Sequence, residues 1–203
     1  MKREEKINKS PLKSRVVFFV TNNLSKFNEG RMVASKQGIT LGMLRAKTPE
    51  IQSDRLAEIA RRSVLEAFRR WKLPVIVEDA GLFVDELKGF PGPYSAYVYK
   101  TIGNQGLIKL LENVENRRAT FRSLIAYYAD KLKAPMCFEG KVVGNIIREE
   151  KRKTSRCGFG FDPIFQPLET KKTFAELSIE EKNKFSHRGK ALNQFAEWYK
   201  KLQ

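Results

Sequence analysis

Short apolar runs alternate with longer amphipathic segments in the first half of the chain. The runs at residues 15–20 (RVVFFV), 39–46 and 74–77 are bounded by turn residues and are too short for helices, which predicts buried strands. Between the last two runs, apolar residues recur at helical spacing from 56 to 71, with Ser53 as the expected N-cap. Strands that alternate with helices predict an α/β core.

The second half of the chain has a different pattern. A helix is expected at about 104–115, and residues 119–128 and 136–147 then alternate between the two faces of long antiparallel strands. These strands would widen the sheet into a second lobe. A capping-box spacing from Ser178 to Glu181 predicts a short helix, and residues 186–189 open a final amphipathic helix. The pattern therefore predicts a mixed sheet flanked by helices and widened into a second lobe.

The charge of the chain favours an anionic partner. The 203 residues include 39 Lys and Arg against 23 Asp and Glu, a net charge of +16. Such an excess suits nucleic acid, nucleotides or an anionic membrane surface, but it also fits a merely solvated surface. Residues 1–14 lack apolar periodicity, so we expect a flexible basic extension before a single two-lobed domain at 15–203.

Composition also excludes several classes of protein. No apolar run reaches the roughly 18 residues that a membrane helix needs, and the apolar run at 16–20 is too short for a signal peptide. Cys137 and Cys157 lie 20 positions apart and the chain has one histidine, which argues against a zinc site or a disulfide framework. We therefore expect a soluble, cytoplasmic protein.

The first candidate for chemistry is the stretch VEDAGLFVDELKGFPGPYSA at residues 77–96. Its buried run ends on Glu78 and Asp79, and ligands of open α/β folds bind at the carboxyl ends of strands. Adjacent strand residues point to opposite faces, so only one of these two acids can face a given cleft. Two carboxylates this close need a cation or a basic partner nearby. The alternative is a strand end with solvated acids and a Pro/Gly loop.

The polar turn after the first strand is a candidate phosphate site. Residues 21–26 (TNNLSK) lead into a helix, whose N-terminus offers backbone N–H groups and a positive dipole end to an anion. Lys26 adds a mobile cation. The alternative is an ordinary strand–helix turn with Ser25 as N-cap. Because the first glycine is Gly30, the turn is neither a Walker loop nor a dinucleotide fingerprint.

Two later segments could hold a planar ring and an anion. In GFGFDPIF, residues 158–165, glycines and Asp162–Pro163 make a bent loop that can present an aromatic ring for stacking, although two core phenylalanines fit equally. In the second segment, His187 is the only histidine of the chain and shares a helix start with Ser186 and Arg188.

Together, four segments strongly resemble the inosine/xanthosine triphosphate pyrophosphatase family: TNNLSKFNE, VEDAGLFVDELKGFPGPYSA, GFGFDPIF and KTFAELSIEEKNKFSHRGKAL. The resemblance runs from about residue 16 to 192. It implies an elongated α/β fold with a cleft between two lobes, a homodimer, and Mg²⁺-dependent hydrolysis of ITP, dITP and XTP. The bond broken would lie between the α and β phosphates, which yields a monophosphate and pyrophosphate.

The resemblance also implies roles by position. Glu50 and Glu78 match acidic positions near the metal, and Asp79 matches the acid that binds it and positions or deprotonates the attacking water. The implied substrate-binding residues comprise the phosphate turn, the ring that stacks on the base with its pocket wall, and the segment that grips base and phosphates: Thr21, Asn23 and Lys26; Phe159, Phe161 and Asp162; Lys182, Ser186, His187 and Arg188.

The resemblance suggests how the base is selected. Inosine and xanthosine carry an acceptor oxygen at the six-position, where adenine carries an amino donor. Arg188 can only donate hydrogen bonds, so it should favour the oxo group. Guanine has the same oxo group, and rejection of GTP must involve the two-position.

Three positions depart from the family pattern. Asn22 stands where glycine is common, so the turn could require a left-handed asparagine. The long helix has Arg61, Arg62 and Ser63 where a lysine is common, and Arg62 is the expected substitute, although its guanidinium differs from an ammonium. Ala80 replaces a frequent serine.

Two other functions stay open. A basic nucleic-acid-binding protein would explain the charge of +16, although the acids around Glu78 argue against it as the main function. A pyrophosphatase of similar fold that acts on other modified nucleotides, including pyrimidines, is the second.

Overall fold

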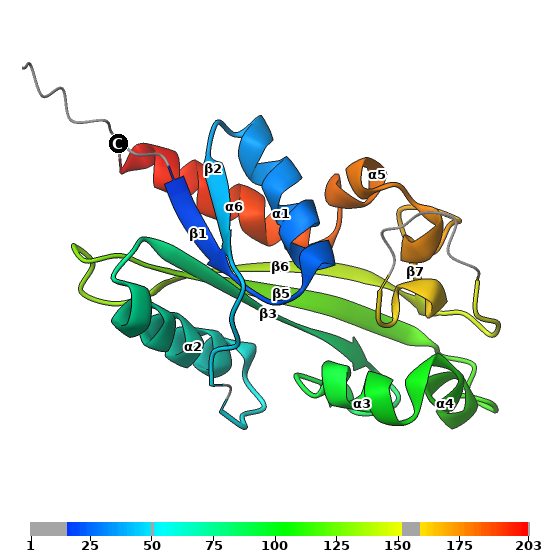
Figure 1. Ribbon diagram of the computed structural model, residues 1–203. Helices are drawn as coiled ribbons and strands as arrows, with labels where there is room; N and C mark the ends of the chain where they lie inside the picture. The colour runs from blue at the N-terminus through cyan, green and yellow to red at the C-terminus, as the bar shows by residue number, and fades with distance from the viewer. Residues whose placement is uncertain (1–15, 50, 152–158, 203) are drawn as a thin grey trace, which may run out of the picture.

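The computed structural model describes residues 16–49, 51–151 and 159–202, and these residues share one mixed sheet (Figure 1). The sheet order is β2-β1-β3-β5-β6-β7, with β4 paired to β3. The strands are β1 (Val16–Val20), β2 (Thr40–Leu44), β3 (Val75–Val84), β4 (Pro91–Gly92), β5 (Arg118–Tyr128), β6 (Met136–Ile146) and β7 (Phe165–Pro167). β1 pairs in parallel with β2 and β3, and the other pairs are antiparallel. The predicted mixed α/β sheet is confirmed.

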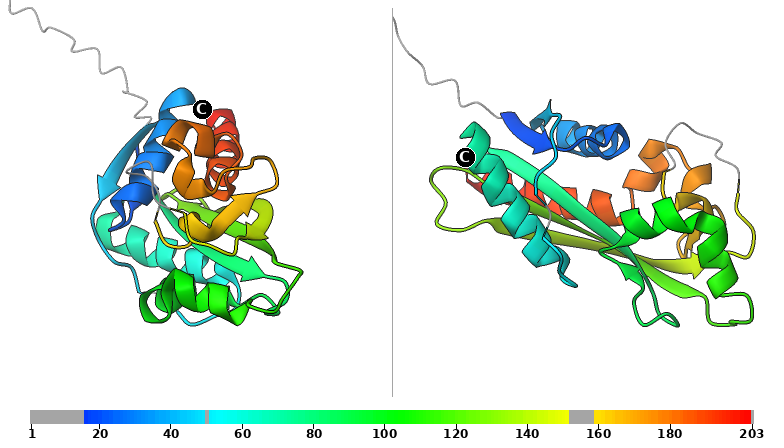
Figure 2. Two further views of the ribbon diagram at one scale, coloured as in Figure 1. Left: turned by 90° about the vertical axis from the view of Figure 1, so that its right-hand side faces the viewer. Right: turned by 60° about the horizontal axis from the view of Figure 1, so that its bottom comes forward.

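Helices cover both faces of the sheet. They are α1 (Leu24–Lys36), α2 (Leu56–Trp71), α3 (Ser95–Thr101), α4 (Gly103–Leu110), α5 (Ile179–Asn183) and α6 (His187–Lys201), with 3-10 turns η1 (Asp162–Ile164) and η2 (Phe174–Glu176). The end-on view in Figure 2 has α1 and α6 on one side of the sheet and α2 and α3 on the other. None of the described helices is long and apolar enough to span a bilayer.

The alternation of residues along the strands divides the core between these faces. On β3, Ile76 packs into the cluster beneath α1 and α6, while Val77 packs into the cluster beneath α2. On β5, Ile125 and Leu124 make the same division. A third cluster, which includes Phe121, fills the far end of the sheet around α4, β7 and the 3-10 turns. The long strands thus join two lobes of one sheet.

The acidic stretch is not a strand end, contrary to the prediction. β3 continues through Glu78 and Asp79 to Val84, because β5 pairs with it along its whole length. The edge of β3 opposite β5 is paired only near its two ends. β1 pairs with β3 only at Phe18–Val75 and Phe19–Ile76, and β4 pairs with it again only at Leu82 and Phe83. Among the described residues, the edge of β3 between these points has no neighbouring strand, and the acids lie beside this gap.

Several local predictions were wrong in detail. Ser53 is not the N-cap of α2, since Arg55 holds that position and the Ser53 hydroxyl accepts a hydrogen bond from the Arg55 amide instead. Asn23, not Ser25, caps α1 through its side chain. The helix expected at 104–115 is a pair of short helices, α3 and α4, that begins earlier and ends at Leu110.

Candidate active site

Two hollows meet beside the open edge of β3. One is mostly apolar, with a volume of about 360 Å³, and the other is more polar, with a volume of about 470 Å³. Both are lined by Asn23, Lys26, Ala96 and Lys100, so they form one continuous cleft. We call them the apolar hollow and the polar hollow. A ligand with a flat apolar part and a charged chain fits such a pair.

The start of α1 forms one wall of the polar hollow. Asn23 Oδ1 accepts a hydrogen bond from the Lys26 amide at 3.0 Å, and Thr21 Oγ1 accepts one from the Asn23 amide at 3.1 Å. These bonds fix the turn and leave the positive end of the α1 dipole at the hollow, which favours an anion. Asn22 does not have a positive φ angle, so the expected left-handed asparagine is wrong.

Glu78 and Asp79 point to opposite faces of β3, as the strand geometry predicts. Asp79 follows Val77 to the α2 side, lines the polar hollow, and its Oδ1 accepts a hydrogen bond from the Ala80 amide at 3.1 Å. The side chain of Glu78 is fully buried and contacts three donors: Lys26 Nζ at 2.8 Å, Arg188 Nε at 3.1 Å and Ser123 Oγ at 2.7 Å. Asp79 is therefore the acid that the strand directs toward the hollow, while Glu78 anchors two cations.

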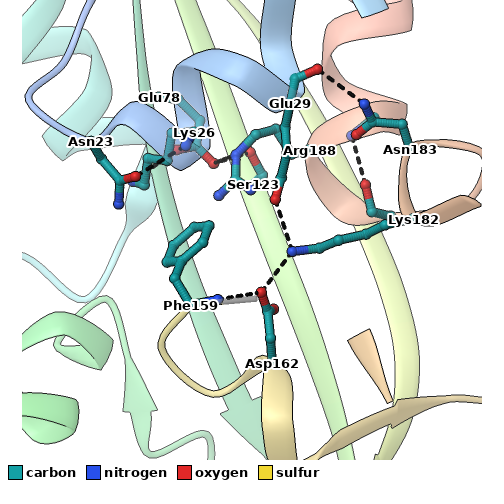
Figure 3. A network of polar contacts seen from close by, with 12 residues as sticks. Asn23, Lys26, Glu29, Glu78, Ser123, Phe159, Asp162, Lys182, Asn183 and Arg188 are labelled. Atoms are coloured by element: carbon teal, nitrogen blue, oxygen red, sulfur yellow. Dashed lines mark hydrogen bonds and ion pairs between the residues drawn. The ribbon is translucent and has the colours of Figure 1, made fainter. Parts of the chain in front are cut away.

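A buried ion network continues from Glu78 toward α5 (Figure 3). Arg188 also donates to Glu29 on α1, and Lys182 Nζ donates to Glu29 Oε1 at 3.0 Å and to Asp162 Oδ2 at 2.8 Å. The side chains of Lys182 and Arg188 are 1% and 2% exposed. With Lys26, the network holds three cations and three carboxylates. Its charges balance, as buried charges must.

Burial and the neighbouring charges have opposite effects on the pKa values of the residues in this network. Burial raises the pKa of Glu29, but the charges of Arg188 and Lys182 outweigh it and the net shift is downward. Burial likewise opposes Arg188 and Lys26 at Glu78, whose pKa falls well below its usual range. The pKa of Lys182 is raised, since Asp162 and Glu29 outweigh burial. These three shifts favour the charged forms, whereas the pKa of Asp162 is raised because burial and the charge of Glu29 outweigh Lys182.

Aromatic side chains line the apolar hollow. Phe121 of β5 stacks on His187 with the ring centroids 4.7 Å apart and the planes 10° apart, and Tyr99 meets Phe161 edge to face at 5.7 Å. The Phe159 ring has the cations of Lys182 and Arg188 each 5.3 Å from its centroid. A base that stacks on Phe159 must use a face that these cations leave open, or displace the ring.

His187 is a neutral imidazole in this hollow. Burial is the largest cause that lowers its pKa well below 6.5, and the nearby charges of Arg188 and Lys182 add to it. Within the described part of the chain, its Nδ1 has no hydrogen-bond partner. A neutral imidazole offers one donor and one acceptor, which is suited to the polar edge of a ring.

The structure brings most of the predicted residues together. The phosphate turn, Asp79, the aromatic loop and Arg188 line the joined hollows. Lys182 lies behind the apolar hollow in the ion network, and Ser186 is buried as the N-cap of α6, accepting from the Gly189 amide at 3.0 Å. The prediction for Glu50, like that for residues 1–14, falls outside the described residues. The substrate-binding and metal-binding roles stay predictions.

Arg62 does not occupy the place expected for a helix lysine. It is about half exposed and pairs with Glu66 one turn along α2 at 3.2 Å. Ser63 faces the polar hollow instead, because it lies on the buried face of α2. No group of three or more metal-ligating side chains occurs in the described part of the chain.

Sequence reasoning missed several residues of the cleft. Glu29 follows Lys26 at helical i,i+3 spacing, which could have placed it on the same face of α1. Ser123 is the single small polar residue in the buried half of β5, a signal that was also readable. Lys47, Tyr99 and Lys100 come from loops and short helices that meet the cleft only through the tertiary fold.

Comparison with known proteins identifies the family of this chain. The Ham1 family model matches residues 17–198. Curated relatives from Methanopyrus kandleri and Thermococcus kodakarensis, both named dITP/XTP pyrophosphatase, are 48% identical over 91% and 90% of this chain and 96% of their own.

Solved structures show the same fold. The Ham1 protein from Staphylococcus aureus matches with a TM-score of 0.75 at 27% identity, and covers 92% of this chain and 100% of its own. A HAM1 protein from Coxiella burnetii matches with a TM-score of 0.77 at 28% identity, over 92% of this chain and 98% of its own. This chain belongs to the Ham1 family.

Proposed function

We propose that this chain hydrolyses the deaminated purine nucleotides ITP, dITP and XTP to a monophosphate and pyrophosphate, and so removes them from the nucleotide pool. The observation that carries the proposal is the position of Asp79 in the polar hollow, which opens directly into the apolar hollow with its aromatic lining. The names of the relatives from Methanopyrus kandleri and Thermococcus kodakarensis support the same reaction.

Asp79 is the group proposed to act on water. Its carboxylate lines the polar hollow, and the Ala80 amide at 3.1 Å holds one of its oxygens in place. A carboxylate that accepts a hydrogen bond from water orients the water and takes up its proton as the water attacks phosphorus. Attack at the α-phosphate breaks the bond to the bridging oxygen and expels pyrophosphate. The dipole of α1 and Lys26 then face the negative charge that develops.

The carboxylates of the polar hollow fit a Mg²⁺ ion whose other ligands are substrate phosphates and water. Mg²⁺ is usually held by one or two carboxylates together with substrate phosphates and water. Asp79 would be its ligand, with Glu50 as a second from outside the described residues. Glu78 is less available, since both of its oxygens already contact donors. When bound, the ion would supply positive charge to the phosphates at the site of attack.

The base is proposed to bind in the apolar hollow with its six-oxo group toward Arg188. Arg188 donates to Glu78 through Nε and to Glu29 through Nη1, and an arginine has five N–H donors. The carboxylates hold the guanidinium rigidly, so an amino group at the six-position of adenine would face a donor and remain unpaired.

Pyrophosphate release with Mg²⁺ tests the proposal. We expect rapid release from ITP and XTP, little from ATP and GTP, and none with a chelator. Equal release from all four would keep the reaction but contradict base selection by Arg188. Faster release from modified pyrimidine triphosphates than from ITP would favour the alternative substrate class. No release from any nucleotide would contradict the proposed function.

We further propose a homodimer in the cytoplasm, on the strength of the family resemblance. Light scattering after gel filtration measures the mass directly. A mass near 23.4 kDa, the mass of one chain, would contradict the dimer.

A further inference from the structure

Two lysines in the cleft belong to neither the ion network nor the predicted site. Lys47 lies in the loop between β2 and α2, and Lys100 lies in the last turn of α3. Both line the polar hollow, and Lys100 also lines the apolar one. Each is exposed. Neither side chain forms an ion pair or hydrogen bond with any described residue.

The charges of the polar hollow show why these lysines matter. Its described charged residues are three lysines and two carboxylates: Lys26, Lys47, Lys100, Glu78 and Asp79. Lys26 lies 2.8 Å from Glu78 and is neutralised by it. Lys47 and Lys100 are therefore the described cations of this hollow whose side chains are not already paired with a carboxylate.

The deeper cations are already engaged. Arg188 and Lys182 are buried and each contacts two carboxylates, so neither can turn to a phosphate without losing an ion pair. An unpaired, exposed ammonium loses little when it binds a phosphate, because no ion pair must break first. Lys47 and Lys100 are the cations of the described cleft that meet this condition.

Their positions divide the phosphate chain between them. Lys100 lies where the two hollows join, and a nucleotide whose base fills the apolar hollow would place its α-phosphate at this junction. Lys47 lines only the polar hollow, where the β and γ phosphates of such a nucleotide would lie. The two lysines come from separate parts of the chain, since Lys47 follows β2 and Lys100 belongs to α3.

We propose that Lys100 and Lys47 are phosphate-positioning residues, with Lys100 at the α-phosphate and Lys47 at the β and γ phosphates that leave as pyrophosphate. The inference rests on the proposed function, because it assumes a nucleoside triphosphate in the cleft. It adds that the charge for binding the phosphate chain comes from these two exposed lysines, not from the conspicuous buried cations.

The test is equilibrium binding of the α,β-methylene analogue of ITP, which cannot be cleaved at the reacting bond, in the presence of Mg²⁺. Inosine, IMP and pyrophosphate are measured alongside it. The variants are Lys100→Met and Lys47→Met, which keep the length of the side chain and remove its charge. Lys131→Met is the matched control, because Lys131 is an exposed lysine in the β5–β6 connection.

Each cleft variant should bind the analogue at least about tenfold more weakly than wild type, the loss expected for one charge-assisted hydrogen bond. Inosine binding should be unchanged. Lys100→Met should also weaken IMP, whereas Lys47→Met should weaken pyrophosphate and leave IMP unchanged. Lys100→Arg should recover most of the affinity, since it restores the charge.

Three outcomes would overturn the inference. If both variants bind the analogue as tightly as Lys131→Met, the lysines do not position phosphate, although the proposed function survives in the wild type. If inosine binding falls in parallel, the substitutions act through the fold. If the wild-type chain binds no triphosphate analogue, the proposed function fails and this inference fails with it.

Discussion

Lys182 Nζ lies 2.8 Å from Asp162 Oδ2 in the interior of the protein, and this contact joins α5 to the turn η1 of the aromatic loop. The same ammonium donates to Glu29 on α1 at 3.0 Å. One buried lysine thus ties together three segments that are far apart in the sequence. It positions the loop of Phe159, because Asp162 Oδ2 also accepts a hydrogen bond from the Phe159 amide at 2.9 Å.

Lys182→Met should destabilise the protein by about 3–5 kcal/mol, because it leaves Glu29 and Asp162 buried with one cation fewer. Urea unfolding measures the loss. Lys36→Met is the matched control, since Lys36 pairs with Glu180 at the same distance of 2.8 Å but on the exposed surface, with both side chains more than half exposed. Its stability should change little. Equal losses in the two variants would show that the buried network contributes nothing particular.

Asp79→Asn should lower kcat by at least about 100-fold, the range for loss of a general base, and leave the free energy of unfolding nearly unchanged. The measurement is pyrophosphate release from ITP at saturating substrate. Asp85→Asn is the control, because Asp85 is half exposed and its nearest cation, Arg118, is 3.9 Å away. A variant at Asp79 that keeps near-normal kcat would rule out its proposed role.

The stability of the protein should fall as the pH drops from 6.5 to 5. His187 is the only histidine, and its pKa in the folded state is depressed by burial and by the charges of Arg188, Lys182 and Lys26, which outweigh Glu78. The unfolded chain takes up a proton near pH 6.5 while the folded chain does not, so protons favour unfolding below that pH. For this single proton, the free energy of unfolding should fall by at most about 1.4 kcal/mol per pH unit.

Urea unfolding at several pH values tests this, with His187→Gln as the comparison. Between pH 6.5 and 5, the free energy of unfolding of the variant should not show this fall, whatever its value at pH 7. Glu29 and Glu78 do not contribute there, because their lowered pKa values affect stability only below the ordinary pKa of about 4.5. Burial raises the pKa of Asp162, which acts in the opposite direction in both proteins, so the difference between wild type and His187→Gln isolates the histidine. An identical slope in both proteins would contradict the neutral imidazole.

Gly140→Ala should destabilise the protein by about 1–3 kcal/mol, in the range for overpacking. A Cβ on Gly140 of β6 would lie 2.1 Å from the His187 carbonyl oxygen and 2.5 Å from the Ala191 amide, so α6 would have to move. Because that helix carries Arg188, KM for ITP should rise as well. Gly30→Ala is the control, where the nearest atom to the new Cβ is 3.4 Å away. Comparable losses at both positions would argue against the close approach of α6.

Much of the fold could be predicted from periodicity alone. The alternation at 119–128 and 136–147 matches β5 and β6 almost residue for residue, and the helical spacing from 56 to 71 coincides with α2. The capping box of Ser178 and Glu181 forms as the spacing indicates. These features depend on neighbours along the chain, and local hydrogen bonding and the period of the side chains determine them.

The length of β3 was not predictable in this way. Glu78, Asp79 and Gly81 are poor strand residues, and they remain extended because β5 pairs with every residue from Val75 to Val84. The same alternation that separates Ile76 from Val77 directs Glu78 to Arg188 and Asp79 to the polar hollow. Pairing over long sequence separation overrode local preference.

The sequence by itself determined the class of the fold and the segments that form the site, because strands, caps and the acidic, aromatic and Ser-His-Arg motifs are local. Only the tertiary structure decided which charges are available to a ligand. Lys182 and Arg188 look like ligand-binding cations in the sequence, but folding buries them against Glu29, Glu78 and Asp162. Lys47 and Lys100 look ordinary, and the meeting of two lobes places them in the cleft without acidic partners among the described residues.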